Sequence, residues 1–216
     1  MEAIVRNASN LNTEALLLFS ALALVTVSKL IDESRFQHFI LLFFSDKYLK
    51  LYSKDQNLTL SAFNILLFLA QILCYGLLIS YTIYFFNIQV DKNLLLIFTF
   101  LGIFILFKFY TEKIIATVFN ITGLAEQLHF EKLSYRNLTA LFLLPLVTLL
   151  IFSPLNKKII LFTTIILFVF LNFIGLLLTL KNHQKLIANK FIYFILYLCA
   201  LEIAPYLIMA KLLVFK

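Results

Sequence analysis

The run FIYFILYLCALEIAPYLIMAKLL occupies Phe191–Leu213 and is the stretch from which the fold of this chain can be argued. Its length of about 23 mostly apolar residues is enough to cross the hydrocarbon core of a bilayer as one helix. Glu202 lies midway along the run, where a charged side chain costs roughly 2.5–3.5 kcal/mol on insertion scales. An ionisable group kept at that depth is expected to have a function, so Glu202 is the first candidate.

The residues that follow Glu202 predict a local break in this helix. Pro205 has no N–H to donate to the carbonyl of Leu201, so we expect a kink beside the carboxyl group. Tyr206 lies one turn beyond Glu202 and is within reach of it. Two interpretations stay open: a hydrogen-bonded carboxyl group that pins helix packing or contacts a partner subunit, and a protonatable group on an ion path. The candidate polar partners in other apolar runs are Asn64, Gln71, Tyr75 and Asn172.

The composition extends the membrane pattern to the whole chain. Of 216 residues, 62% are hydrophobic and 13% are charged, against about 45–50% and about 25% in soluble domains. The mean hydropathy is +0.99. We therefore predict a single integral membrane domain over residues 1–216, folded as an all-α polytopic bundle of about six transmembrane helices. The six apolar runs are Thr13–Leu30, Leu58–Phe86, Asn93–Tyr110, Leu138–Leu155, Ile159–Leu180 and Phe191–Leu213.

The distribution of lysine and arginine predicts the orientation of the chain. Twelve of these residues fall in the loops after the first, third and fifth runs, and six fall on the opposite side. The positive-inside rule then makes those three loops cytoplasmic and puts both termini in the periplasm. Because topology accounts for the net charge of +7, we do not expect nucleic acid as a partner. The predicted basic cytoplasmic face consists of Arg35, Lys47, Lys50, Lys113, Lys132 and Arg136.

Two of the predicted cytoplasmic segments contain more than connecting loop. The first lies between the third and fourth runs and predicts an amphipathic helix at the inner membrane surface. Its apolar residues at helical spacing are Ile114, Val118, Ile121, Ala125 and Leu128. In the second, Ile31–Asn57, Lys47 and Lys50 interrupt the apolar face. Docking of this segment against the other loops and a flat position on lipid both stay open.

The residues give little support to an enzyme. His38, His129 and His183 fall in three different predicted loops, and their spacing is not that of a metal or acid–base site. Independent histidines are the favoured interpretation. No phosphate-binding glycine loop or nucleophile elbow is present in the sequence, so no catalytic residue, cofactor or metal is predicted. A membrane lipid-modifying enzyme with a site at the cytoplasmic face is kept as an alternative.

Two stretches resemble a known family. Phe191–Lys211, and Lys29 followed by Arg35-Phe36, are similar to multi-pass inner-membrane proteins of Bacteroidota that are defined as a domain of unknown function. The resemblance implies a bacterial inner-membrane location and directs attention to Glu202, Pro205 and Arg35. It implies no activity.

Association with that phylum leads to the functional expectation. Its envelopes contain membrane assemblies for secretion and motility, so we expect a non-enzymatic accessory or assembly subunit of such a complex. Its partners would be the lipid bilayer and other inner-membrane subunits. The main alternative is a small proton- or ion-coupled transporter component that uses Glu202.

Overall fold

The described part of the chain is built of helices. The computed structural model describes residues 8–53, 61–86, 94–118, 122–153 and 156–182, and it has no strand within these ranges. This confirms the predicted all-helical architecture. The helices are α1 (Ala8–Ile31), α2 (Glu33–Ile40), the 3-10 turn η1 (Leu41–Phe43), α3 (Lys47–Tyr52), α4 (Ala62–Phe85), α5 (Leu94–Val118), α6 (Thr122–Phe152) and α7 (Lys157–Asn182).

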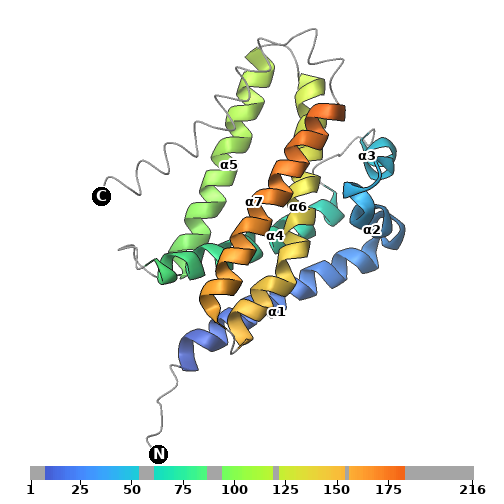
Figure 1. Cartoon of the computed structure of the whole chain (residues 1–216). Coiled ribbons are helices and arrows are strands. Elements are labelled where there is room, and N and C mark those ends of the chain that lie inside the picture. Colours follow the sequence, from blue (N-terminus) through green and yellow to red (C-terminus); the bar gives the residue numbers. More distant parts are fainter. Residues whose placement is uncertain (1–7, 54–60, 87–93, 119–121, 154–155, 183–216) are drawn as a thin grey trace, which may run out of the picture.

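The long helices pack in two directions. Figure 1 shows α5, α6 and α7 running in similar directions, with α1 and α4 crossing them obliquely. Helix α1 packs on α4, and α6 packs on both α4 and α7. The short elements α2, η1 and α3 lie beside the bundle, next to the end of α1. Helices α4 and α6 are therefore the two central elements, because each contacts every other long helix.

The two larger of three apolar clusters in the described residues hold the bundle together around α6. One joins α1, α4 and α6 through side chains such as Ala21, Leu77 and Leu143. The other joins α2, η1 and α3 to α4 and α6, and its centre is formed by Phe39 and Phe130, which are fully buried. The second cluster fixes the short helices against α4 and α6.

Four of the described helices are long and apolar enough to cross a membrane, which indicates a membrane protein. They overlap the first, second, fourth and fifth predicted runs. From residue 94 on, the third predicted run falls within α5, whose second half carries Lys108, Glu112 and Lys113. The sixth run lies outside the described residues. Six spans are thus not confirmed. The four segments are Thr13–Ile31, Ala62–Phe85, Ala125–Phe152 and Lys157–Asn182.

The region of the predicted amphipathic helix differs from the expectation. Its residues are divided between the end of α5 and the start of α6, and a separate amphipathic helix is not confirmed. Ile114 and Val118 are exposed on α5, whereas Ala125 and Leu128 are buried on α6. The residues from 129 to 137, expected as loop, continue α6 as helix because neighbouring helices surround them.

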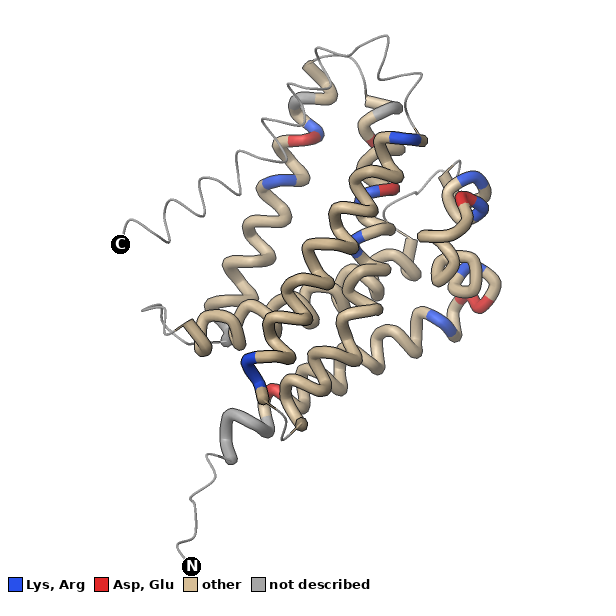
Figure 2. Tube along the Cα trace, in the orientation of Figure 1, with Lys and Arg blue, Asp and Glu red and all other residues tan. Residues whose placement is uncertain are grey.

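Charged residues gather at one end of the bundle. Figure 2 shows most of them on α2, α3, the end of α5, the start of α6 and the end of α7. At the opposite end, Glu14 accepts a hydrogen bond of 2.5 Å from the Tyr81 hydroxyl. Nζ of Lys157 lies 5.9 Å from the centroid of the Tyr81 ring. The end that carries α2, α3 and the α5–α6 junction is called the charged end below.

Candidate functional site

The middle of α6 carries buried polar side chains. Glu131, Ser134, Asn137 and Thr139 are all buried there. The hydroxyls of Ser134 and Thr139 donate to carbonyls one turn earlier in the same helix, at 2.8 and 2.9 Å, so they need no other partner. Glu131 instead accepts a hydrogen bond from a neighbouring helix, and contacts of this kind make up the candidate site.

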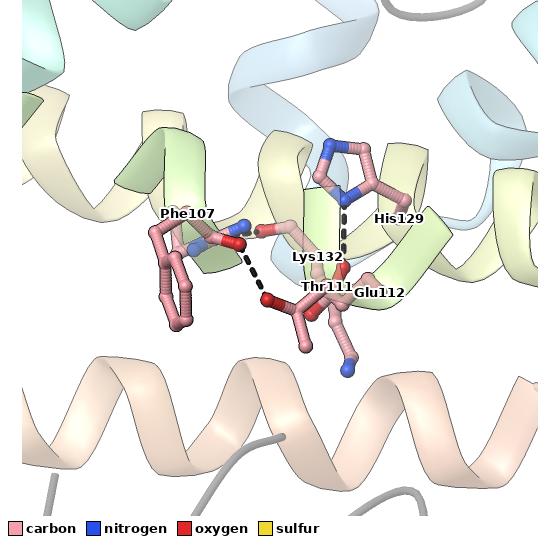
Figure 3. Close-up of polar contacts among 6 residues, drawn as sticks. Phe107, Thr111, Glu112, His129 and Lys132 are labelled. Carbon is pink, nitrogen blue, oxygen red and sulfur yellow. Dashed lines mark hydrogen bonds and ion pairs between the residues drawn. The ribbon is translucent and has the colours of Figure 1, made fainter. Parts of the chain in front are cut away.

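A carboxylate–histidine pair joins α5 to α6. The Nδ1–H of His129 donates to Oε2 of Glu112 at 3.0 Å (Figure 3). The Phe109 ring packs edge-on against the imidazole, with 4.8 Å between ring centroids. The side chains of His129 and Glu112 are only 15% and 7% exposed. The pair is therefore shielded from water. A charge-assisted hydrogen bond is stronger in such a buried environment than in water.

Basic side chains surround Glu112. Burial alone raises the pKa of its carboxyl group, but the hydrogen bond from His129 and the charges of Lys132 and Lys108 outweigh burial and hold the pKa below its ordinary value. Lys108 lies one turn before Glu112 on α5 and is itself buried. Glu112 is thus ionised at neutral pH, and it acts as an acceptor and counter-ion rather than as an acid.

Arg35 lies buried among aromatic rings. Asp32 caps α2 by accepting the backbone N–H of Arg35 at 2.9 Å, which starts the helix at this point. The guanidinium lies 4.7 Å from the Tyr52 ring centroid and 5.0 Å from that of Phe63. Its Nε is buried without a hydrogen-bond partner. Desolvated cation–π contacts of this kind contribute about 2 kcal/mol each.

Tyr48 links the short helices to α4. Its ring is fully buried, and its hydroxyl donates to Oδ1 of Asn64 at 3.4 Å. Burial raises the pKa of Tyr48 above its ordinary value, although the nearby Arg35 lowers it in part. The hydroxyl therefore stays protonated and remains a donor.

Further polar contacts tie α6 to α7 and α4. Nδ2 of Asn182 donates to Oε2 of Glu131 at 3.5 Å, and the Tyr75 hydroxyl donates to the carbonyl of Arg136 at 3.1 Å. Figure 3 shows the neighbouring α5 contact, in which Thr111 bonds only within its own helix, to the carbonyl of Phe107 at 2.7 Å. The contacts of the charged end thus connect four elements through α6.

Three of the six predicted intramembrane polar residues lie on two described helices, α4 and α7. Asn64 and Gln71 lie two turns apart on α4, both buried, and Asn172 donates to the carbonyl of Phe168 in its own helix α7 at 2.8 Å. Oε1 of Gln71 is buried without a hydrogen-bond partner, as is Oδ1 of Asn137 on the packed neighbour α6. The other three predicted residues, Glu202, Pro205 and Tyr206, lie outside the described residues.

The predicted basic face consists of residues in three kinds of environment. Lys47, Lys50 and Lys113 are exposed, and Lys132 and Arg136 are half-buried. Arg35 is buried. Only the exposed lysines are accessible to an external partner.

Sequence reasoning missed the partnership of Glu112 with His129. The signal was weak: Lys108 and Glu112 are four residues apart and so share a helical face, but the predicted third span ended at Tyr110. His129 was noted, but as an independent loop residue. The contact of Tyr48 with Asn64 was also missed, because nothing local in the sequence predicts it.

Comparison with known proteins identifies a family. DUF4271, described as a domain of unknown function, matches residues 15–213. No curated protein and no solved structure matches the chain. Since the match covers most of the sequence, the chain belongs to the DUF4271 family.

Proposed function

We propose that this member of the DUF4271 family is a non-enzymatic accessory subunit that helps to assemble a complex of the bacterial inner membrane, in the class that serves secretion or motility. The observation that carries the proposal is that the ionisable groups inside the charged end are bonded to neighbouring helices of the same chain. Such groups hold a scaffold in shape. The partner subunit would be bound by the exposed surface around Lys113 at that end and by the sixth predicted span, Phe191–Leu213.

The contacts of the charged end support a structural role for its inner polar groups. Glu112 is bonded to His129, Glu131 is bonded to Asn182, and Arg35 is packed between rings. A reacting centre would instead present such groups to a substrate. The exposed Lys113 near the end of α5 is suited to an acidic patch on a partner, because complementary charges steer association and select the partner.

The proposal includes a topology of six spans with both termini in the periplasm. The gathering of charged residues at one end supports a cytoplasmic position for that end, by the positive-inside rule. The exposed apolar Ile114 and Val118 support an amphipathic strip at the inner surface. The resemblance of the C-terminal stretch supports a Bacteroidota source.

Affinity purification from the native host tests the accessory role. The tagged full chain is purified in mild detergent, and co-purifying proteins are quantified by mass spectrometry against an unrelated multi-span membrane protein. We expect a membrane-protein partner in stoichiometric amount. A chain that purifies alone would contradict the proposal.

Two charge changes locate the partner surface. Lys113→Glu at the charged end is expected to reduce recovery of the partner. Lys158→Glu makes the same change at an exposed position of the opposite end and is expected to leave recovery unchanged. Equal recovery of the partner with both variants would show that the charged end is not the contact surface.

The intramembrane carboxyl group gives a second test. If Glu202 only forms hydrogen bonds, Glu202→Gln retains both the complex and its activity, because the amide can still donate and accept. Loss of activity with the complex intact would argue against a purely structural role.

A proton- or ion-coupled transporter component is the second candidate. It is favoured by the buried oxygens of Gln71 and Asn137 on the packed helices α4 and α6, which have no hydrogen-bond partner and are potential cation ligands. This candidate predicts pH-dependent cation flux in liposomes that Glu202→Gln abolishes and Gln71→Leu reduces. Flux unchanged by both variants would exclude this path.

A further inference from the structure

The segment α2–η1–α3 has two faces of different character. Its inner face is packed into the aromatic cluster: Phe39 and Tyr48 are fully buried, and the ring centroids of Phe39 and Phe63 are 5.9 Å apart. Its outer face exposes large apolar side chains, with Leu41 53%, Phe44 87% and Leu51 57% exposed. Since the inner face is fixed against α4 and α6, the outer side chains cannot turn into the core.

Charged side chains lie among the exposed apolar ones. Lys47 and Lys50 are exposed on α3, between Phe44 and Leu51 in the sequence. The four-carbon stem of a lysine can lie along apolar surface while its ammonium group reaches a more polar layer. Leu41, Phe44, Leu51, Lys47 and Lys50 are called the outer face below.

Chain connectivity places the outer face near the bilayer boundary. The candidate span in α1 ends at Ile31, and a single residue, Asp32, separates it from α2. Leu30 and Ile31 are 83% and 53% exposed, so the apolar surface of the span continues toward the segment. Figure 1 shows α2 and α3 beside the end of α1 rather than beyond the bundle. Water would be an unfavourable environment for this surface.

We propose that the outer face lies in the headgroup layer of a phospholipid leaflet, with Leu41, Phe44 and Leu51 in the upper acyl region and Lys47 and Lys50 at the phosphates. Interfacial helices bury their apolar face about 5–10 Å into the boundary between headgroups and acyl chains. Lysine ammonium groups at that level meet phosphate oxygens. The segment thus acts as a lateral anchor that sets the depth and tilt of α1. This inference does not depend on the accessory role.

The lack of tryptophan in the chain allows a direct measurement of depth. Phe44→Trp introduces a single tryptophan, and the full protein is placed in nanodiscs whose lipids carry bromine either near the headgroup or near the chain end. Phe19→Trp, on the exposed side of the α1 span at 74% exposure, serves as a deep reference. Free N-acetyltryptophanamide serves as the aqueous reference.

The proposal predicts a distinct pattern for the Phe44→Trp reporter. Its emission is shifted to the blue of the aqueous reference, and bromine near the headgroup quenches it more than bromine near the chain end. Phe19→Trp shows the opposite order. Leu41→Trp repeats the Phe44→Trp pattern and guards against a misfolded single variant.

Three outcomes would overturn the proposal. Aqueous emission with no quenching by either lipid would place the outer face in water, and quenching in the order of Phe19→Trp would place it deep in the bilayer. Shielding in native membranes that is absent in nanodiscs would assign the face to a protein partner.

The lysines are tested with the same reporter. Lys47→Glu with Lys50→Glu is expected to reduce quenching by bromine near the headgroup, because phosphates repel carboxylates. The matched pair Lys157→Glu and Lys158→Glu at the opposite end should leave it unchanged. An equal effect of the two pairs would show that the lysines of the outer face do not contact phosphates.

Discussion

Replacement of Glu112 by glutamine should destabilise the bundle more than replacement of its partner His129. In Glu112→Gln the carboxylate that faces Lys108, His129 and Lys132 is lost. The buried Lys108 and the half-buried Lys132 then lose the counter-ion that Glu112 provides. In His129→Gln, Glu112 loses one hydrogen bond of 3.0 Å but keeps its electrostatic attraction to Lys108 and Lys132. The two substitutions are therefore unequal, although they break the same pair.

The magnitudes follow from the burial of the pair. Removing one partner of a buried ion pair costs about 3–5 kcal/mol, and the partial exposure of His129, 15% of its side chain, places Glu112→Gln near the lower limit. Loss of one hydrogen bond to a charged group costs about 1.5–3 kcal/mol, which applies to His129→Gln. Because the residues are in contact, the double variant should lose less than the sum, by roughly 0.5–3 kcal/mol.

The assay is the free energy of unfolding measured by SDS titration in mixed micelles. Glu126→Gln is the matched control, since it makes the same chemical change at an exposed glutamate of α6 and should cost less than about 0.5 kcal/mol. Equal losses for Glu112→Gln and His129→Gln, or strict additivity in the double variant, would refute the account of Glu112 as a shared counter-ion.

The pH dependence of the unfolding free energy tests the direction of the Glu112 pKa shift. The pKa of Glu112 is lowered in the folded protein from the ordinary value of 4.5, so its stabilising contribution is fully present above that value. It is lost as the pH falls through the folded pKa. The difference in unfolding free energy between wild type and Glu112→Gln should therefore persist at neutral pH and shrink below pH 4.5.

Four further substitutions test the packing of the bundle, each by the same SDS titration. Arg35→Lys should lose about 1–2 kcal/mol, because an ammonium group is more strongly hydrated than a guanidinium and cannot stack flat on the rings; unchanged stability would contradict the cation–π assignment. Gly175→Ala places a methyl carbon 3.0 Å from Cβ of Tyr135 and should cost about 1–3 kcal/mol. Gly102→Ala, which meets nothing within 4 Å, should be neutral or gain up to about 1 kcal/mol. Tyr75→Phe removes the bond to the carbonyl of Arg136 and should cost about 0.5–1.5 kcal/mol, and no loss would show that this bond is not stabilising.

The helical nature of the apolar runs could be predicted from the sequence. The runs Thr13–Leu30 and Ile159–Leu180 lie within α1 and α7, which extend beyond them at both ends. Length and hydropathy are sufficient to predict that such segments are helices. A backbone in lipid must satisfy its hydrogen bonds internally, and a helix does so locally. Buried polar residues such as Asn64 and Gln71 were also recognisable, since each interrupts an apolar run.

The course of the chain from residue 129 to 137 was not predictable in the same way. Glu131, Lys132 and Arg136 give this stretch the local hydropathy of a loop, yet it is the interior of α6. Its charges are accommodated by distant partners: Glu112 is 17 residues from His129, and Asn182 is 51 residues from Glu131. A hydropathy window cannot include partners at those separations.

The sequence alone thus determined that this chain is a helical membrane protein with basic segments between apolar runs, because hydropathy, helix length and charge are properties of local residues. Only the tertiary structure decided that α4 and α6 are the central helices, that Glu112 is the counter-ion at the α5–α6 contact and that Arg35 is buried while Lys47 and Lys50 are exposed. The physical reason is that the cost of burying a polar group depends on the partners that other helices bring to it, and those partners are set by packing.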